Sequence, residues 1–259
     1  AWKKISHGIS EAEVTRIAIA PDDPVALLVS TPRAVYKSHG ASGYLASLYL
    51  EGSKRVVHDI FVDPQTKEIY LATDQGLYQS LDAGSSWVKI YSSEKGKEEE
   101  CLSVVTVGPS IFLGTTRGLF VSNRSESRWK LFLGCFQDKP IFHITKDSKY
   151  VYASSLNEAY RIKPIGKETI KIFSVVSQQN DAEDAQQKPM GQEIIRDIVV
   201  SSLEKAQQIW LISTRGMFIS NNFGNQWEQI PQDSIPLEDI TSAAVCQGAL
   251  FVSSNKGTY

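Results

Sequence analysis

The sequence predicts an all-β protein, a six-bladed β-propeller built from four-stranded antiparallel blades. Three observations support this prediction: a motif that recurs about every forty residues, four short strand-like runs within each repeat, and two chain ends that complement each other. A repeat of 20 to 50 residues indicates an architecture in which each unit buries its apolar surface against the next one.

The repeat is clearest as a glycine followed eleven residues later by a tryptophan. This spacing occurs at Gly76 and Trp87, Gly118 and Trp129, and Gly216 and Trp227. Weaker copies fill the intervals, so that the aligned positions are 34, 76, 118, 158, 216 and 257. One interval, from 158 to 216, is longer than the others. We interpret its polar segment 178–192, rich in Gln, Asp and Ala, as a loop insertion, and the two alternatives for it are a disordered excursion and a recognition segment.

The strand pattern is clearest in the second repeat. Residues 57–62, 68–73, 76–80 and 87–91 are rich in β-branched and aromatic residues and are separated by Gly, Asp and Pro. Four strands in about forty residues are typical of a propeller blade. The predicted blades cover 6–50, 51–93, 100–134, 139–177, 193–232 and 237–259, the last completed by 1–5.

The chain ends predict how the ring closes. Residues 2–5, Trp-Lys-Lys-Ile, resemble the fourth-strand segments that begin at Trp87, Trp129 and Trp227, whereas 257–259 resemble the start of a third strand. We therefore expect the N-terminal strand to pair with the C-terminal blade and to close a single domain, residues 1–259, which removes exposed strand edges. The alternative is that the chain is a fragment of a longer protein.

One eight-residue motif carries a family resemblance. Ser80, Asp82, Gly84 and Trp87 match the pattern of the Asp-box, or BNR repeat, and Ser220, Asn222, Gly224 and Trp227 keep it with Asn in place of Asp. The chain resembles the Asp-box β-propeller superfamily, which includes sialidases, xyloglucan hydrolases, sortilin-like receptors and photosystem II assembly factors. Its character is closest to the non-catalytic assembly-factor and sortilin-like members.

The third repeat departs from this pattern. Ser122 and Trp129 are kept, but Arg124 and Ser127 stand where Asp and Gly are expected. We call 80–87, 122–129 and 220–227 the box turns of the second, third and fifth blades. An Asp or Asn can accept hydrogen bonds from backbone N–H groups, Gly can adopt positive φ, and Trp can pack between strands. In the family these turns lie on the perimeter, so the resemblance implies a structural role.

Composition limits the classes of partner and cofactor. A formal net charge of -2 argues against nucleic acid or an anionic membrane as the main partner, and no apolar run reaches the length of a membrane span. Cys101, Cys135 and Cys246 lack metal-ligand spacing, so we interpret them as core residues or free thiols. No metal or cofactor is expected.

Catalytic activity would require the residues that the enzymes of the family use, and the sequence can be compared with that requirement. The resemblance implies that a sialidase would need an arginine triad and a Tyr nucleophile paired with Glu. No arginine stands in the usual Arg-Ile-Pro context, and Arg16-Ile17-Ala18 is only a partial match. Asp59 and Asp197 could still form a carboxylate pair across a channel. We interpret His58 and His143 as hydrogen-bonded structural residues. The prediction is a protein that is not an enzyme, with a glycosidase as the alternative.

A candidate binding ring follows from the first strands, which line the central channel of a propeller. Alignment of these strands places polar residues at one equivalent position, and alternation along a strand turns them to the same side. This predicted ring consists of Arg16, Asp59, Ser103, His143, Asp197 and Thr241. The alternative interpretation is a wet channel whose polar walls only face water.

The sequence therefore predicts a non-catalytic protein-interaction or assembly scaffold. The alternatives are a carbohydrate-active enzyme or glycan-binding propeller, and a receptor-like domain of a longer chain. Family resemblance implies a periplasmic, secreted or lumenal location. Protein partners are expected and a glycan is the alternative ligand, while the oligomeric state stays open.

Overall fold

Strands are the regular elements of the part of the chain that the structure describes, and no helix occurs there. The computed structural model describes residues 14–38, 45–48, 56–92, 100–126, 128–132, 134–166, 168–175, 194–203, 206–231, 240–246, 249–254 and 257–258. The chain divides into two compact units, Ala1–Ile141 and Phe142–Tyr259.

The first unit contains three four-stranded antiparallel sheets, each ordered as in the sequence. The first blade comprises β1 (Arg16–Ile19), β2 (Leu27–Ser30), β3 (Val35–Ser38) and β4 (Leu45–Leu48). The second comprises β5 (Val57–Val62), β6 (Ile69–Thr73), β7 (Gly76–Ser80) and β8 (Val88–Tyr91). The third comprises β9 (Cys101–Val107), β10 (Ser110–Thr115), β11 (Gly118–Asn123) and β12 (Lys130–Leu131).

The second unit contains two four-stranded sheets and one of three strands. The fourth blade comprises β13 (His143–Lys146), β14 (Val151–Ser154), β15 (Glu158–Ile162) and β16 (Thr169–Ser174). The fifth comprises β17 (Ile195–Leu203), β18 (Ala206–Ser213), β19 (Gly216–Ser220) and β20 (Glu228–Gln229). The last sheet comprises β21 (Ile240–Cys246), β22 (Ala249–Ser254) and β23 (Gly257–Thr258).

The number of complete blades differs from the prediction. Five sheets have four strands where the sequence predicted six, and the last sheet has three. The segment predicted to supply its fourth strand, 1–5, lies outside the described residues, as does the insertion 178–192. The pairing of the two chain ends therefore stays a prediction.

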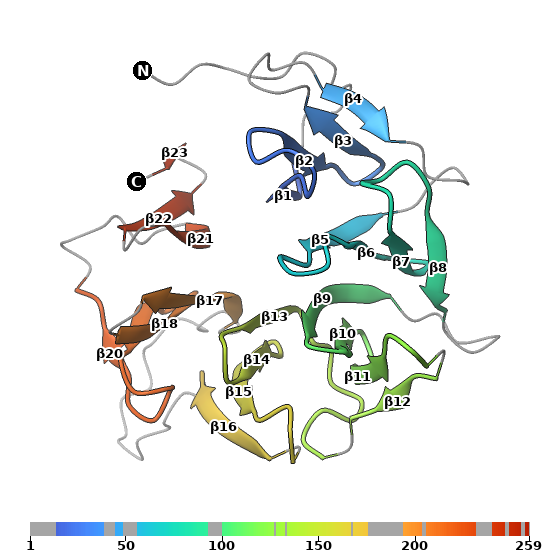
Figure 1. Cartoon of the computed structure of the whole chain (residues 1–259). Helices are drawn as coiled ribbons and strands as arrows, with labels where there is room; N and C mark the ends of the chain where they lie inside the picture. The colour runs from blue at the N-terminus through green and yellow to red at the C-terminus, as the bar shows by residue number, and fades with distance from the viewer. Residues whose placement is uncertain are drawn as a thin grey trace, which may run out of the picture. The chain divides into compact units, whose positions relative to one another are not determined.

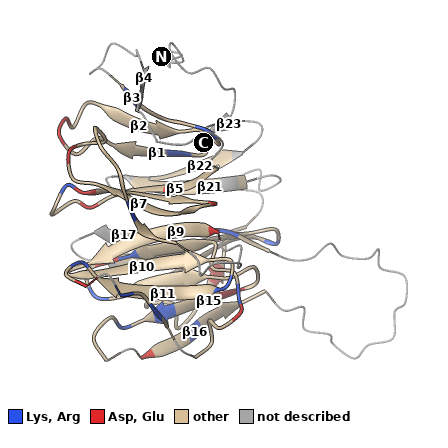
Figure 2. Cartoon of the chain, turned by 90° about the vertical axis from the view of Figure 1, so that its right-hand side faces the viewer, with Lys and Arg blue, Asp and Glu red and all other residues tan. Residues whose placement is uncertain are grey.

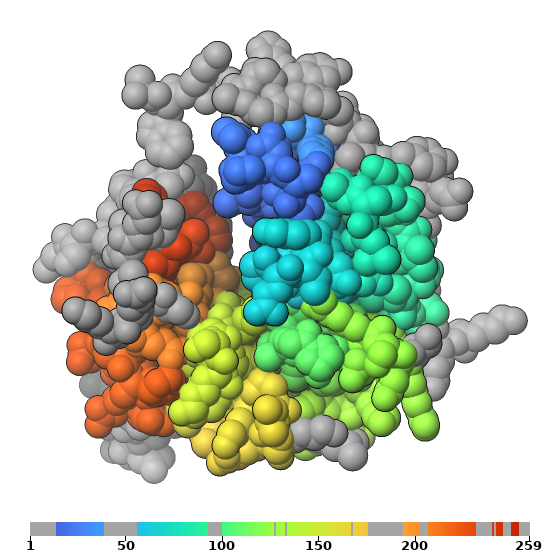
Figure 3. Space-filling view, viewed as in Figure 1, coloured from blue at the N-terminus to red at the C-terminus, as the bar shows by residue number. Residues whose placement is uncertain are grey.

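Within each unit, neighbouring blades pack through their first strands. β5 contacts both β1 and β9 in the first unit, and β17 contacts both β13 and β21 in the second. The ribbon view shows β1, β5 and β9 at the inner ends of their sheets and β8 and β12 at the outer ends (Figure 1). In the space-filling view the first three blades lie directly against one another (Figure 3).

Apolar side chains fill the space between blades. Leu28, Ile60 and Leu71 belong to a buried cluster shared by the first and second blades, and Tyr70, Leu77 and Val104 belong to one shared by the second and third. Because a blade has a neighbour on each face, an inner strand such as β6 is buried at all five positions. Charged residues lie mainly in turns and near strand ends along the ribbon (Figure 2).

The repeat glycine has a steric cause. Gly76 opens β7 with a φ of +133°, and a Cβ atom there would lie 2.2 Å from the carbonyl oxygen of Tyr91. Gly118 and Gly216 occupy the same position, with φ of +147° and +130°. The hydroxyl of Thr73 donates to the carbonyl oxygen of Gly76 at 2.7 Å and completes the turn. Only glycine fits a site that combines positive φ with this close approach.

Among the described residues, no helix has the length and apolarity needed to cross a membrane. The same residues contain no group of three or more His, Cys, Asp or Glu side chains placed to hold a metal ion.

Candidate functional site

Asp59 brings together the three predicted ring residues of the first unit. Its Oδ1 lies 3.3 Å from Nε of Arg16 on β1. Its Oδ2 accepts hydrogen bonds from the hydroxyl of Ser103 and the backbone N–H of Val104 on β9, both at 3.1 Å. The carboxylate therefore links the first strands of three successive blades.

Asp197 has the same role in the second unit. Its Oδ2 accepts a hydrogen bond from the backbone N–H of Ala243 on β21 at 3.1 Å. Its Oδ1 lies 3.9 Å from Nδ1 of His143 on β13. Thr241 lies on β21, but its side chain is outside the described set. The ring residues thus fall into two groups, one in each unit, and each group is centred on an aspartate that bridges first strands.

The other histidine singled out by the sequence also faces a carboxylate. Nε2 of His58 on β5 lies 3.2 Å from Oε2 of Glu100, so the two form an ion pair when the imidazole is protonated. A binding role for the ring stays a prediction, because the contacts of Asp59 and Asp197 are sufficiently explained by the joining of blades.

The box turn of the second blade closes on itself. The hydroxyl of Ser80 accepts the N–H of Gly84 at 2.8 Å, and Oδ1 of Asp82 accepts the N–H of Ser86 at 2.8 Å. Hydrogen bonds from the Ser86 hydroxyl, the Ser86 N–H and the Ser80 hydroxyl lower the pKa of Asp82 to about 2.

The box turn of the fifth blade has the same hydrogen bonds without a charge. The hydroxyl of Ser220 accepts the N–H of Gly224 at 2.9 Å, and Oδ1 of Asn222 accepts the N–H of Gln226 at 2.8 Å. An amide oxygen thus replaces the carboxylate in this geometry.

The box turn of the third blade is built differently. Glu126, four residues after Ser122, occupies the position of Gly84 and Gly224, so the assignment of Ser127 to that position is wrong by one residue. The hydroxyl of Ser122 donates to the carbonyl oxygens of Glu126 and Arg128, at 3.0 and 3.1 Å. In the other two turns the equivalent hydroxyl donates instead to the side-chain oxygen of Asp82 or Asn222 and also accepts the N–H of the box glycine. The third blade has neither that side-chain acceptor nor the glycine.

Arg124, at the position of Asp82, leaves the turn and reaches the preceding blade. Its Nη2 forms an ion pair with Asp63, and its Nη1 lies 3.1 Å from Oε2 of Glu68. The hydroxyl of Thr106 on β9 also donates to Asp63. Arg124 was recognisable in the sequence as a departure from the Asp-box pattern, but no sequence feature indicated Asp63 or Glu68 as its partners.

Asp63 is ionised because its hydrogen bonds outweigh its burial. Burial alone acts to raise the pKa, but bonds from the Thr106 hydroxyl, the N–H groups of Thr66 and Gln65, and Arg124 lower it to about 2. The N–H bonds measure 3.1 and 2.7 Å. An aspartate directly after a first strand, able to accept N–H groups two and three residues later, is the sequence signal that could have found this residue.

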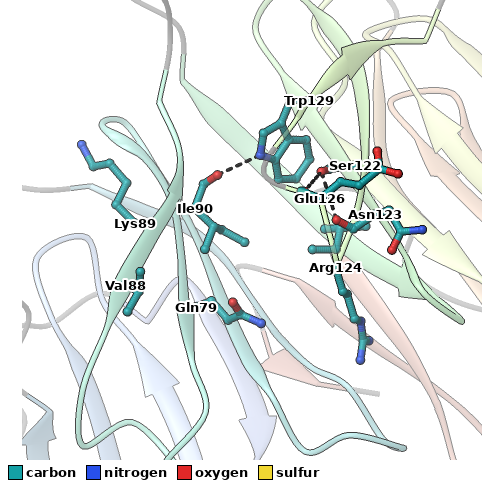
Figure 4. A pocket seen from close by; sticks show the side chains of 10 residues that line it. Gln79, Val88, Lys89, Ile90, Ser122, Asn123, Arg124, Glu126 and Trp129 are labelled. Atoms are coloured by element: carbon teal, nitrogen blue, oxygen red, sulfur yellow. Dashed lines mark hydrogen bonds between the residues drawn. The ribbon is translucent and has the colours of Figure 1, made fainter.

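A crevice of about 250 Å³ lies between the second blade and the box turn of the third. Figure 4 shows β8 on one side and Trp129, Ser122, Asn123 and the stem of Arg124 on the other. Its lining consists of Gln79, Val88, Lys89, Ile90, Ile111, Ser122, Asn123, Arg124, Glu126 and Trp129.

One hydrogen bond fixes the upper wall of the crevice. Ile90 is an extra residue in β8, since Leu77 pairs with Tyr91 and Tyr78 with Lys89. Its carbonyl oxygen accepts the indole N–H of Trp129 at 2.8 Å. A β-bulge re-aims the backbone in this way, so the bulge of β8 and the hydrogen-bonded indole of Trp129 form one wall of the crevice.

The corresponding place in the second unit is filled. Ile172 is the bulge residue of β16, and its carbonyl oxygen accepts the indole N–H of Trp227 at 2.7 Å. Gly224 lies so close that a Cβ atom on it would be 2.8 Å from Cβ of Ile172. Nη1 of Arg161 donates to the carbonyl oxygen of Phe223 at 2.6 Å. The glycine of the box turn therefore permits direct contact with the preceding blade.

Four-stranded antiparallel blades that pack through their first strands define the class of protein, a β-propeller. No family model matches the sequence, and no curated protein matches it. Comparison with solved structures therefore carries the assignment of the fold.

Three solved structures illustrate the similarity. An extracellular domain described as part of a one-component system of B. thetaiotaomicron has a TM-score of 0.72 at 13% identity, over 96% of this chain and 33% of that one. A GH74 xyloglucanase from Xanthomonas campestris has a TM-score of 0.68 at 16% identity, over 95% of this chain and 44% of the xyloglucanase. PorZ, a surface component of the type-IX secretion system of Porphyromonas gingivalis, has a TM-score of 0.69 at 15% identity, over 95% of this chain and 38% of PorZ. The chain thus spans less than half of each of these proteins.

Proposed function

We propose that the chain is a non-catalytic protein-interaction or assembly scaffold of the Asp-box propeller type. The observation that carries this proposal is the crevice between the second and third blades. It is lined by residues of paired strands and of a box turn, and Val88 in this lining is 64% exposed. An apolar side chain exposed next to a preformed hollow is a feature of surfaces that bind proteins.

The size of the crevice favours a protein over a small molecule or an oligosaccharide. Sites for drug-sized ligands measure about 300–1,000 Å³, whereas this crevice measures about 250 Å³. That volume suits one side chain of a partner. The use of Asp59 and Asp197 as bridges between first strands also favours a scaffold, because each carboxylate is held by a backbone N–H.

The similar structures support the proposal at the level of the fold. One is an extracellular domain and another is a bacterial surface component of a secretion system. We accordingly propose an extracytoplasmic location. Since the chain covers about a third of either protein, its partners are inferred from its own surface.

Site-specific crosslinking tests the proposal. A photo-reactive benzoyl-phenylalanine placed at Val88 should capture a defined protein from a native extract, whereas the same group at Ile165 should not. Ile165 is a matched control because it is an apolar residue, 86% exposed, in a turn of the fourth blade. Equal capture at both positions, or none at Val88, would overturn the use of this crevice as a protein-binding surface.

A carbohydrate-active propeller is the second candidate, favoured by the similarity to the GH74 xyloglucanase. It predicts hydrolysis or binding of a polysaccharide and a loss of that activity in Asp59→Asn or Asp197→Asn. A glycan array and a reducing-sugar assay with xyloglucan would decide it. Glycan binding without capture at Val88 would favour this candidate over the scaffold.

A further inference from the structure

Two cationic and two aromatic side chains meet where the fourth blade contacts the box turn of the fifth. We call Lys149, Tyr150, Arg161 and Phe223 the Tyr150 patch. The ring centroids of Tyr150 and Phe223 lie 5.7 Å apart. The ammonium of Lys149 lies 5.1 Å from the ring centroid of Tyr150, and the guanidinium carbon of Arg161 lies 4.9 Å from it. Two cations are thus gathered on one aromatic side chain.

Neither cation of the patch is neutralised by a carboxylate. Among the residues that the structure describes, Lys149 and Arg161 form no ion pair. Nη1 of Arg161 donates to the carbonyl oxygen of Phe223 at 2.6 Å, and its other N–H groups have no acceptor in the described part of the chain. Lys149 is exposed and Arg161 is half-buried. Both side chains therefore keep donors for an external acceptor.

The carboxylates of the same blade already have partners. Asp147 accepts the N–H groups of Lys149 and Tyr150, at 2.5 and 2.7 Å, and the hydroxyl of Tyr152 at 2.8 Å. Oε1 of Glu158 on β15 lies 2.9 Å from Nζ of Lys171. The chain thus supplies the hydrogen-bond acceptors of this turn but no counter-ion for the patch.

The surrounding charge is positive as well. The described residues of the fourth blade include five cations and three carboxylates, and the box turn of the fifth blade has no charged residue. The cations are Lys146, Lys149, Arg161, Lys163 and Lys171, and the carboxylates are Asp147, Glu158 and Glu168. Both the patch and its blade therefore favour an anionic ligand over a neutral or cationic one.

The second blade shows how an arginine at this place is neutralised within the chain. The register of the strands puts Tyr150 at the position of Glu68 and Arg161 at that of Gln79. In the first unit Glu68 pairs with Arg124. In the second unit a tyrosine stands in place of this carboxylate, and Arg161 has no acidic partner among the described residues. The difference leaves a guanidinium open to a carboxylate from another molecule.

Phe223 adds a second ring to the patch although its backbone conformation does not favour a large side chain. Its φ is +61°, and the equivalent residue of the second box turn, Ala83, has a φ of +55°. A bulky residue at positive φ is rare. The ring of Phe223 contacts that of Tyr150, and the ammonium of Lys149 lies 5.6 Å from its centroid. These contacts favour an aromatic residue here and hold the cation at the surface.

We propose that the Tyr150 patch binds an acidic segment of a partner protein. One carboxylate of this segment accepts hydrogen bonds from the free N–H groups of Arg161, and another pairs with the ammonium of Lys149. The patch belongs to the second unit, whereas the crevice belongs to the first, so this is a further binding surface. The inference rests on the proposed scaffold function only for the source of the acidic segment.

Titration of the full chain with a capped tetraglutamate peptide tests the proposal. The arginine Nε–H signals of 15N-labelled protein are followed by NMR, and Arg161→Gln and Arg124→Lys assign two of them. The signal of Arg161 should shift with saturation at millimolar peptide. That of Arg124 should stay in place, because its guanidinium already has Asp63 and Glu68. A capped tetraglutamine peptide, and inorganic phosphate at the same ionic strength, should produce no saturable shift.

Variants with the same change of charge on one blade sharpen this test, with the Kd measured by fluorescence anisotropy of the labelled peptide. Lys149→Gln should raise the Kd by about two- to five-fold, as expected for an exposed ion pair. Arg161→Gln should raise it by about five- to ten-fold, because a guanidinium can bind a carboxylate through two N–H groups. Lys171→Gln is the matched control and should leave the Kd unchanged, since Lys171 is already paired with Glu158. An equal Kd in all three variants would overturn the proposal.

One substitution should close the patch from within the chain. Tyr150→Glu gives the fourth blade the residue that stands at Glu68, and its carboxylate should pair with Arg161. The Kd of the peptide should then rise by about ten-fold or more. Tyr150→Gln removes the same ring without adding a charge and should raise the Kd less. Thermal unfolding shows that both variants are folded, and the same Kd in both would count against binding through the two cations.

The outcomes separate this inference from the scaffold function. Ile165, the control position for crosslinking, lies in the turn 163–168 of the same blade. Capture at Val88 and Ile165 is therefore compared in Tyr150→Glu, in which the patch is closed. Capture at Val88 without peptide binding by the parent chain would remove only the acidic segment. Peptide binding without capture at Val88 would keep the patch and count against the crevice as a protein-binding surface.

Discussion

The box turns of the third and fifth blades contact the preceding blade in two different ways. In both, a tryptophan donates its indole N–H to the carbonyl oxygen of a bulge residue on the preceding blade. In the fifth blade the turn closes through Ser220 and Asn222, and Gly224 lies against Ile172. In the third blade the turn lacks both features and leaves a crevice. The tryptophan anchor, rather than the complete motif, is the contact that both blade pairs share.

The two turns also differ in the direction of their arginine contacts. Arg124 extends from the turn back to Asp63 and Glu68 on the preceding blade. Arg161 extends from the preceding blade forward to a carbonyl oxygen of the turn. In the third blade an ion pair thus replaces contact through glycine, and the crevice lies beside this ion pair.

The largest expected loss of stability comes from removing Asp63, a carboxylate partner of Arg124. Asp63→Ala leaves a largely buried guanidinium with one carboxylate instead of two and removes the acceptor of the Gln65 and Thr66 N–H groups. Because Glu68 still pairs with Arg124, we expect a loss of about 2–4 kcal/mol, below the full cost of an uncompensated buried charge. The side chains of Asp63 and Arg124 are 5% and 18% exposed. Urea unfolding should show this loss as a lower midpoint.

Asp147→Ala is the matched control for that experiment. Asp147 stands at the equivalent position of the fourth blade and accepts the N–H groups of Lys149 and Tyr150 and the hydroxyl of Tyr152. It has no arginine partner among the described residues, so about 1–3 kcal/mol is expected. Equal losses of unfolding free energy in the two variants would show that the ion pair of Arg124 adds no stability beyond that of the hydrogen bonds that both aspartates accept.

A second pair of variants tests why the fifth blade has no room at this place. Gly224→Ala should destabilise the protein by about 2–3 kcal/mol, because φ is +82° and the new Cβ would lie 2.8 Å from Ile172. Glu126→Ala at the same position of the third blade should change the unfolding free energy by less than about 0.5 kcal/mol. Thermal and urea unfolding of both variants would measure the difference, and similar losses would show that close packing at the box-turn position does not distinguish the fifth blade from the third.

A smaller effect is expected from exchanging Asp82 for the residue at the equivalent position of the fifth blade, Asn222, since the two side chains differ by one heavy atom. Asp82→Asn converts the second blade to the Asn form found at Asn222 and should leave the Tm within about 1 °C at pH 7. Asp82→Ala removes the acceptor of the Ser86 N–H and should lower the Tm by about 2–4 °C. Differential scanning calorimetry checks both, and a large loss in Asp82→Asn would show that the charge itself is required.

The sequence predicted the local structure of the blades well, because strand alternation, the repeat glycine and the box turn act within a few residues. Gly76 is an example: its positive φ and its approach to Tyr91 both belong to one hairpin. The ion pair of Arg124 with Asp63 was not predicted, since it joins residues of different blades that no repeat spacing relates. The roles of Asp59 and Asp197 as bridges were missed for the same reason, because their backbone donors lie in the next blade.

The smallest expected effect is a difference in acid sensitivity between the second and fifth box turns. The folded pKa values of Asp63 and Asp82 are both about 2, below their ordinary value of 3.8. The stability they contribute is therefore complete above about pH 4 and is lost as the pH falls towards 2, because the unfolded chain then binds protons first. Asp82→Asn should flatten the fall of Tm between pH 4 and 2, whereas Asn222→Asp should steepen it by adding a second carboxylate of this kind. Identical Tm profiles for the parent and Asp82→Asn over this range would mean that the carboxylate of Asp82 is not held more tightly in the folded protein than in the unfolded chain.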